Sequence, residues 1–280
     1  MKKIIAAFDG LKYSRSTRDY AIQLAKQTSA HLVGVFLEDF TYSSYKVYDL
    51  IHEKGGFIGV AKKKFDKKDQ KTRATAVTDF EAACQKEGLK YTVHHDRNVA
   101  IRELLHESIY ADFLIVGSHE TLTYNTEKLP TEFITELLVH VQCPVMVVPH
   151  RFKPIDKLVL LYDGEPSSVF AIKMFSYSLA ALKVFPTEVV SVNTTKGSAH
   201  VPENKLMKEF MKRHFPTASY TVLKGLPEPE IVNYLQKQKE GSLVVLGAYR
   251  RGMVSRWFRA SMADALMKDL KLPLFIAHNK

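Results

Sequence analysis

Cysteine is scarce in this sequence, and long apolar segments are missing from it. The two cysteines, Cys84 and Cys143, are too few for a disulfide framework or a four-cysteine zinc site. No stretch approaches the roughly 20 apolar residues that span a bilayer. The apolar run at residues 4–8 follows two lysines, but it stops at Asp9 and is too short for the core of an export signal. These absences predict a cytoplasmic protein that does not insert into membranes.

Motifs of catalysis and metal binding are also missing. The sequence has no H-E-x-x-H, C-x-x-C or G-x-S-x-G pattern and no G-x-x-x-x-G-K-[S/T] phosphate loop. His94 and His95 are adjacent at the end of an expected strand, where neighbouring side chains point to opposite faces and make a poor metal pincer. These absences predict that the chain is not an enzyme and has no metal site of its own.

The composition is that of a globular protein with a basic excess. Its 280 residues suggest two domains, and 46% hydrophobic and 25% charged residues exclude a largely disordered chain. The 40 basic and 30 acidic residues give a net charge of +10. Residues 1–152 hold 21 basic and 19 acidic residues, whereas residues 153–280 hold 19 and 11. Anionic partners are therefore expected, chiefly in the second half.

The two halves of the chain repeat one pattern. Apolar runs ending in Asp-Gly place Asp9 and Asp163 154 residues apart. Later segments match at separations of 129 or 130 residues, pairing Tyr91 with Tyr220, Gly117 with Gly247, and Pro144 with Pro273. The register shifts once, by about 25 residues, so the first half carries an insertion near residues 39–75. This repeat predicts related domains at 1–152 and 153–280.

Short apolar runs alternate with amphipathic segments in each half. Strands are expected near residues 3–9, 32–37, 90–95, 112–117 and 144–149, and again near 157–163, 187–193, 218–224, 242–247 and 273–278. Helices are expected near residues 14–28, 62–87, 98–110 and 129–142, and near 166–182, 202–214, 228–239 and 256–270. This alternation predicts an α/β fold of two tandem, doubly wound, five-stranded parallel sheets. We expect the halves to pack through their last strands.

The insertion combines aromatic residues with a lysine-rich segment. Its tyrosines include Tyr42, Tyr45 and Tyr48, and lysines are frequent over residues 62–73. One hypothesis is a lid or a dimer-contact arm, and the alternative is a surface loop that leads into a lengthened helix with solvated lysines. Asp66 and Asp69 favour the alternative, because they could pair with lysines within the helix. No RNA-binding motif is present, so a nucleic-acid partner is not expected.

A ligand site in such sheets lies beyond the carboxyl ends of the strands, between strands one and four. Asp9 and Asp163 end the first strand of each half, and Gly117 and Gly247 end the fourth. The alternative is structural, since Asp-Gly after a strand is a common turn and these glycines also suit tight turns. The residues themselves leave both interpretations open.

With these features each half resembles the universal stress protein family, and the whole chain resembles a tandem member. Cys143-Pro144-Val145 matches a segment that often opens the last strand in that family. The resemblance implies a Rossmann-like fold of the adenine-nucleotide α-hydrolase type and a role in stress response. It also implies an adenine contact from an Asp after the first strand. A motif after the fourth strand would then hold ribose and phosphates: glycine, two residues, glycine, nine residues, glycine, then Ser or Thr.

In the first half this motif is partly lost. Asp9, Gly117 and Thr131 match, but Glu120 and Pro130 replace the second and third glycines. Glu120 adds negative charge beside the expected phosphates, and Pro130 removes a backbone N–H donor. Both changes oppose nucleotide binding by this half.

The second half departs from the motif more mildly. Asp163, Gly247 and Ser261 match, whereas Arg250 and Ala260 replace glycines. Ala260 keeps its N–H, and Arg250 with the arginines at 251, 256 and 259 could bind phosphates bidentately. The alternative for these arginines is a solvated basic loop. If one half binds a nucleotide, we expect it to be this one.

The resemblance therefore implies a stress-response regulatory or binding protein that holds ATP or AMP chiefly in its second half. With it we expect at most slow, incidental ATP hydrolysis, and no metal except magnesium carried by the nucleotide. The alternative is an interaction protein whose two pockets are vestigial. It would recruit a protein partner, or a second copy of itself, through the insertion or the basic second half.

Overall fold

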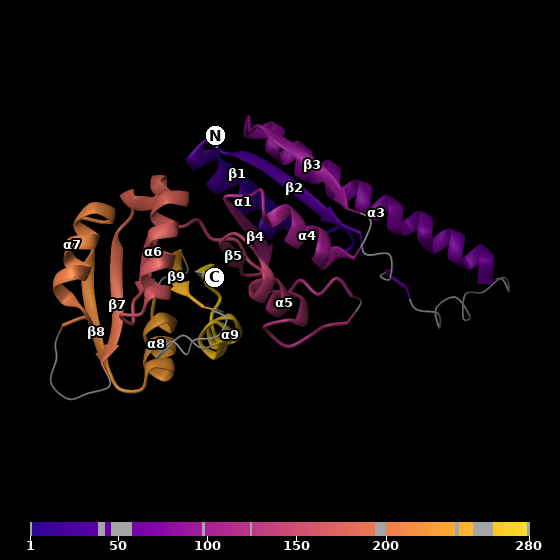
Figure 1. Ribbon diagram of the computed structural model, residues 1–280. Coiled ribbons are helices and arrows are strands. Elements are labelled where there is room, and N and C mark those ends of the chain that lie inside the picture. The colour runs from indigo at the N-terminus through magenta and orange to yellow at the C-terminus, as the bar shows by residue number, and fades with distance from the viewer. Residues whose placement is uncertain are drawn as a thin grey trace.

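The structure is a computed structural model that describes residues 2–38, 43–45, 58–96, 99–123, 125–193, 200–238, 241–248 and 260–278. At 58–61, 96, 260 and 261 the description covers the backbone alone. Strands and helices alternate through both halves of the chain (Figure 1).

The elements of the first half are β1 (Lys3–Asp9), α1 (Arg15–Thr28), β2 (His31–Leu37), α3 (Ile58–Lys86), β3 (Tyr91–Asp96), α4 (Ala100–Ser108), β4 (Phe113–Gly117), α5 (Glu132–His140) and β5 (Val145–Val148). Those of the second half are β6 (Lys157–Leu161), α6 (Pro166–Ser178), the 3₁₀ helix η1 (Ala180–Val184), β7 (Thr187–Asn193), α7 (Asn204–His214), β8 (Ser219–Lys224), α8 (Pro227–Gln236), β9 (Ser242–Gly247), α9 (Ala260–Asp269) and β10 (Leu274–Ala277). The predicted elements match these in order and type. The domain boundary between residues 152 and 153 stays a prediction.

All ten strands belong to one mixed sheet. Its order is β3-β2-β1-β4-β5-β10-β9-β6-β7-β8, so each half contributes five parallel strands in the same doubly wound order. The halves meet where β5 pairs antiparallel with β10, with Val147 opposite Leu274 and Val145 opposite Ile276. The predicted fold class and the packing through the last strands are both confirmed.

Helices cover both faces of this sheet. On one face α1, α3, α6 and α7 pack on strand side chains, and on the other face α4, α5, α8 and α9 do so. The strands are buried on both faces, as their continuous apolar runs predict. Cys84 and Cys143 are buried within these layers. Among the described helices, none combines the length and the apolar character needed to cross a bilayer.

The insertion lengthens the second helix of the first half. Helix α3 has 29 residues, whereas α7, its counterpart in the second half, has 11. Its N-terminal turns project beyond the sheet (Figure 1). Among the ion pairs of the described side chains, none joins Asp66 or Asp69 to a lysine of this helix. Instead, the Tyr45 hydroxyl donates a hydrogen bond to Asp66 at 2.5 Å, and the backbone N–H of Ser44 donates one to the buried Asp69 at 2.9 Å.

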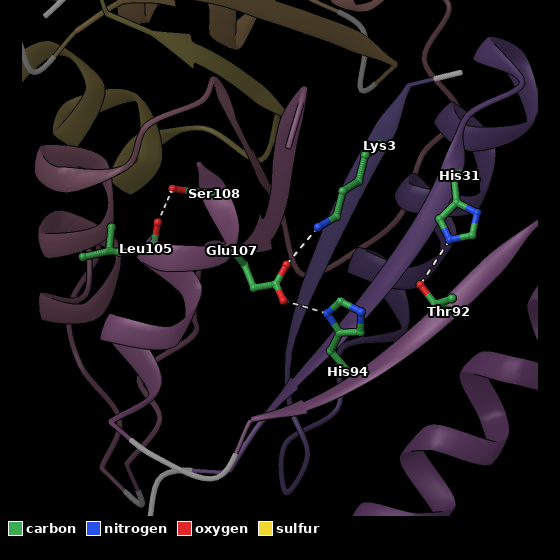
Figure 2. Close-up of polar contacts among 7 residues, drawn as sticks. All are labelled: Lys3, His31, Thr92, His94, Leu105, Glu107 and Ser108. Atoms are coloured by element: carbon green, nitrogen blue, oxygen red, sulfur yellow. Dashed lines mark hydrogen bonds and ion pairs between the residues drawn. The ribbon is translucent and has the colours of Figure 1, made fainter. Parts of the chain in front are cut away.

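Corresponding lysines at the starts of β1 and β6 each bind a carboxylate. Lys3 donates to Glu107 of α4 at 2.9 Å, and His94 of β3 lies 2.7 Å from the other carboxylate oxygen (Figure 2). Lys157 donates to Glu188 of β7 at 2.8 Å. Burial by itself raises the pKa of each glutamate, but these hydrogen bonds outweigh it and lower the pKa. The lysine at this position therefore binds a helix in the first half and a strand in the second half.

Candidate functional site

Asp9 lies at the crevice of the first half, at the carboxyl end of β1. Its side chain is only 2% exposed, and its Oδ1 accepts a hydrogen bond from the backbone N–H of Leu11 at 2.7 Å. This is an Asx turn that fixes the path of the chain into α1. Asp9 therefore stabilises the turn after β1, as the structural interpretation predicted. Its contact with adenine stays a prediction.

Glu120 fills the crevice next to Asp9. It is only 7% exposed, and its backbone N–H donates to the carbonyl of Gly117 at 3.2 Å. A Cβ built on Gly117 would lie 3.2 Å from the Glu120 Oε1 and 3.1 Å from the Thr17 Oγ1. The Glu120 side chain thus folds back over the end of β4, in the space between β4 and α1.

The environment of Glu120 disfavours the charge expected at this position. Burial, followed by the nearby Asp9, raises the pKa of Glu120 well above its usual value. We expected a negative charge beside the phosphates, but the carboxyl is buried and its ionisation is disfavoured. The effect of Glu120 on nucleotide binding stays a prediction.

Thr131 uses its hydroxyl within the fold. The Thr131 Oγ1 donates to the carbonyl of Glu120 at 2.6 Å and accepts from the backbone N–H of Ile134 at 3.2 Å. It is the N-cap of α5 and is almost fully buried. The hydroxyl that the family motif assigns to phosphate is therefore engaged in a helix cap.

Arg73 of α3 covers the crevice from the side of the insertion. A Cβ built on Gly10 would lie 3.1 Å from the Arg73 Cγ. The Arg73 guanidinium lies 3.7 Å from the carboxylate of Glu38, just beyond the end of β2. Sequence analysis missed this residue, because its contact depends on how α3 crosses the carboxyl ends of β1 and β2.

The crevice of the second half has a corresponding aspartate, Asp163, in a shorter turn between strand and helix. Asp163 is 4% exposed, and its Oδ1 accepts from the backbone N–H of Glu165 at 2.9 Å. Gly164 has φ of +87°, so this Asp-Gly turn requires glycine. The N-cap of α6, Glu165, follows Asp163 by two residues, whereas the N-cap of α1, Ser14, follows Asp9 by five. Helix α6 therefore begins closer to the end of its strand.

Gly247 is pressed against the start of α6. A Cβ at this position would lie 2.5 Å from the carbonyl carbon of Ser167 and 2.9 Å from the backbone nitrogen of Ser168. Because both atoms are backbone, neither can move without moving the helix. The close approach by itself explains glycine here, and a phosphate contact of Gly247 stays a prediction.

The remaining predicted phosphate contacts fall mostly outside the described residues. Arg250 and the arginines at 251, 256 and 259 lie outside them, and Ser261 is in α9 with its side chain not described. The aspartates and glycines of both halves do lie at the carboxyl ends of the first and fourth strands, as predicted. In the part of the chain that the structure describes, no group of three or more His, Cys, Asp or Glu side chains could hold a metal ion.

Two further hollows flank these crevices at corresponding places. The first, of about 350 Å³, lies between α3 and the loop from β1 to α1, and Tyr13, Arg15, Lys68 and Lys71 are among its lining residues. We call it the basic groove. The second, of about 450 Å³, lies between α6 and α7, with Tyr162, Phe170, Leu206 and Phe210 among its lining residues. We call it the apolar groove.

Two doubly wound halves in one sheet, each with its first and fourth strands side by side, define a tandem α/β protein. The family model of the universal stress protein family matches residues 1–149, more than half of the chain. The chain belongs to the universal stress protein family. No curated protein matches the sequence.

Solved structures agree with the tandem fold over the full length. A universal stress protein from Archaeoglobus fulgidus aligns with a TM-score of 0.67 and 14% identity, covering 99% of this chain and 98% of that one. A putative universal stress protein from Pseudomonas aeruginosa aligns with a TM-score of 0.60 and 14% identity, covering 99% and 92%. A universal stress protein in complex with cAMP aligns over 45% of this chain and 98% of its own, at 16% identity and a TM-score of 0.33. At these identities the likeness of the first two shows the fold alone.

Proposed function

We propose that this universal stress protein is a stress-response binding protein whose halves have diverged. The second half holds an adenine nucleotide, ATP or AMP, in the crevice beside Asp163, and the first half has lost that capacity. Any hydrolysis of bound ATP is slow and incidental.

The buried position of Glu120 is the observation that carries this proposal. A nucleotide in the first crevice must displace the Glu120 carboxyl from beside Asp9 and Gly117. It must also compete for the Thr131 hydroxyl, which caps α5. Both changes oppose binding, because one exposes a packed side chain and the other removes a helix cap.

The second half has features that favour an anionic ligand. Residues 153–280 hold 19 basic and 11 acidic residues, so a phosphate group meets a more positive field there than in the first half. Asp163 occupies the position of the family's adenine contact, and Ser261 that of its phosphate contact. Arg250 stands where the first half has Glu120. Opposite charges at this one motif position support opposite affinities for phosphate.

Isothermal titration with ATP, ADP and AMP tests the proposal. Asp163→Asn and Asp9→Asn form a matched pair, because each aspartate accepts one backbone N–H bond that asparagine can keep. We expect wild type to bind one nucleotide per chain, Asp163→Asn to lose binding and Asp9→Asn to retain it. Ser261→Ala should weaken binding by about tenfold, the usual cost of a lost hydrogen bond to a charged group. Absence of binding at millimolar nucleotide would overturn the proposal.

One observation favours the second candidate, an interaction protein without a nucleotide. The backbone of Ser167 lies so close to Gly247 that the second crevice is narrow at this point. If no adenine nucleotide binds to wild type, both crevices are structural and the chain acts through a protein partner. The titration described above therefore separates the two candidates.

A further inference from the structure

The basic groove lies on the outer side of the first-half crevice. Helix α3 forms one wall with Lys68, Lys71, Thr75 and Asp79, and the loop and first turn leading into α1 form the other with Tyr13 and Arg15. Its volume of about 350 Å³ is within the range of small-molecule sites, about 300–1,000 Å³. It is separate from the space between β1 and β4, where Glu120 lies.

Three cations line this groove, and of these three only Arg15 has a described carboxylate beside it. Lys68 and Lys71 are exposed, and among the described residues neither forms an ion pair. The nearest acids on the same helix, Asp66 and Asp69, accept hydrogen bonds from Tyr45 and Ser44 instead. The side chain of Arg15 is 75% exposed. The groove therefore presents a positive surface formed by two separate elements.

The only described carboxylate lining the groove is already shared. Asp79 forms an ion pair with Arg18 and lies 3.7 Å from Arg15. Asp79 follows Lys71 by eight residues of helix, which is about 12 Å along the axis. Lys68 and Lys71 therefore make one end of the groove cationic. At the other end the carboxylate of Asp79, paired with Arg18, is a hydrogen-bond acceptor.

Between these ends the groove is lined by the ring of Tyr13, which packs on other aromatic rings. The ring of Tyr13 lies 5.1 Å from that of Phe8 and is stacked 6.1 Å from that of Phe36. Burial, opposed by the cation of Arg18 and assisted by Asp79, raises the pKa of the Tyr13 phenol, so the ring remains neutral. A rigid neutral ring beside cations suits a ligand with both a flat or apolar part and an anionic part.

We propose that the basic groove binds a small organic phosphate. Its phosphate lies against Lys68 and Lys71, its ring or sugar covers Tyr13, and Arg15 and Asp79 contact the polar groups at its far end. The insertion thus provides a second ligand site in the half whose nucleotide crevice is closed. This site is independent of nucleotide binding in the second half.

Phenyl phosphate and inorganic phosphate are suitable probes, because neither resembles a nucleotide. The test variant is Lys68→Ala/Lys71→Ala. Its matched control is Lys62→Ala/Lys63→Ala, which removes the same charge from exposed positions of the same helix outside the groove. Binding is followed by titration and by NMR shifts of the Tyr13 and Thr75 backbone amides. We expect the test variant to weaken phenyl phosphate binding by about tenfold and the control by less than about twofold.

A second pair of variants blocks the groove without touching the lysines. Thr75→Glu places a negative charge inside it, whereas Thr78→Glu places one on an exposed part of the same helix. We expect Thr75→Glu to abolish phenyl phosphate binding and Thr78→Glu to retain it, with both variants folded by circular dichroism. Asp163→Asn should leave this binding unchanged, which separates the site from the nucleotide crevice.

Three results would overturn the proposal. The first is no binding of either phosphate to wild type. The second is equal weakening by the two double-lysine variants, which would indicate a diffuse charge effect. The third is binding of an acidic peptide, with the same dependence on Lys68 and Lys71, in place of phenyl phosphate. That outcome would make the groove a protein-docking surface.

Discussion

The two grooves beside the first and sixth strands occupy corresponding places and have opposite chemistry. In the first half a 29-residue helix brings lysines over an aromatic floor. In the second half an 11-residue helix brings Leu206 and Phe210 over Tyr162, and the groove is apolar. The sheet and its helix order are the same in both. The difference shows that the helix between the second and third strands contributes much of the chemistry of each groove's lining, while the sheet supplies the position.

The crevices differ in what lies against the end of their fourth strand. Side chains, those of Glu120 and Arg73, fill the crevice of the first half. In the second half the backbone of α6 approaches Gly247, and the loop that carries Arg250 lies outside the described residues. Side chains can be changed one at a time, whereas a backbone contact involves the whole helix. Substitutions at the two crevices should therefore have unequal effects.

The largest expected difference is between Gly247→Ala and Gly117→Ala. A methyl group at 247 meets the backbone of Ser167 and Ser168, so α6 must move. The nearest atoms to a methyl group at 117 belong to the side chains of Thr17 and Glu120. We expect Gly247→Ala to lower the free energy of unfolding by about 3 kcal/mol and Gly117→Ala by about 1 kcal/mol. Urea denaturation measures both, and equal losses would refute the distinction between the two crevices.

Glu120→Gln should give the next largest effect, with the opposite sign. The folded pKa of Glu120 is raised above its unfolded value, so the folded state binds the extra proton and wild type loses stability as pH rises from about 4.5. Glutamine removes that loss and should stabilise the protein by about 2 kcal/mol at pH 8. Unfolding between pH 4 and pH 8 measures this, with Glu136→Gln on the exposed face of α5 as the control. A variant no more stable than wild type at pH 8 would contradict the buried position of Glu120.

The smallest expected effect compares the two lysine-bound glutamates. Each has a folded pKa below its unfolded value of about 4.5, so each contributes stability that is present above pH 4.5 and lost as pH falls below it. Glu107→Gln should cost about 1 kcal/mol at pH 7. Glu188→Gln should cost slightly more, since Lys157, Thr221 and Tyr234 all donate to Glu188. At pH 3.5 both differences should shrink, and a cost independent of pH would show that the charges are unimportant.

The fold was predictable from the sequence because its signals are local. Apolar runs such as residues 113–117 and Asp-Gly turns at Asp9 and Asp163 mark the strands and their ends. The sequence repeat predicted two related domains. The alternation of strands and helices within each domain predicted its doubly wound parallel sheet. The packing of the halves through β5 and β10 was expected, whereas their antiparallel pairing into one sheet was not part of that expectation.

The site was less predictable because its contacts are long-range. The contact of Arg73 with Glu38 spans 35 residues, and that of Asp69 with Ser44 spans 25. Neither contact can be predicted from helix periodicity, because the two residues of each pair lie in different elements or loops. The motif comparison singled out Glu120 as a departure, but only the structure shows that its carboxyl is buried beside Asp9. Charge in a sequence indicates neither where a side chain lies nor whether it stays ionised.

Hydrogen–deuterium exchange with and without ATP tests the divergence of the halves most directly. The account predicts slower exchange in the turn after β6, near Asp163 and Gly164, and at the start of α9. It predicts no change in residues 118–123, which follow β4 at the first-half crevice. Protection of residues 118–123, alone or together with the second-half segments, would contradict it.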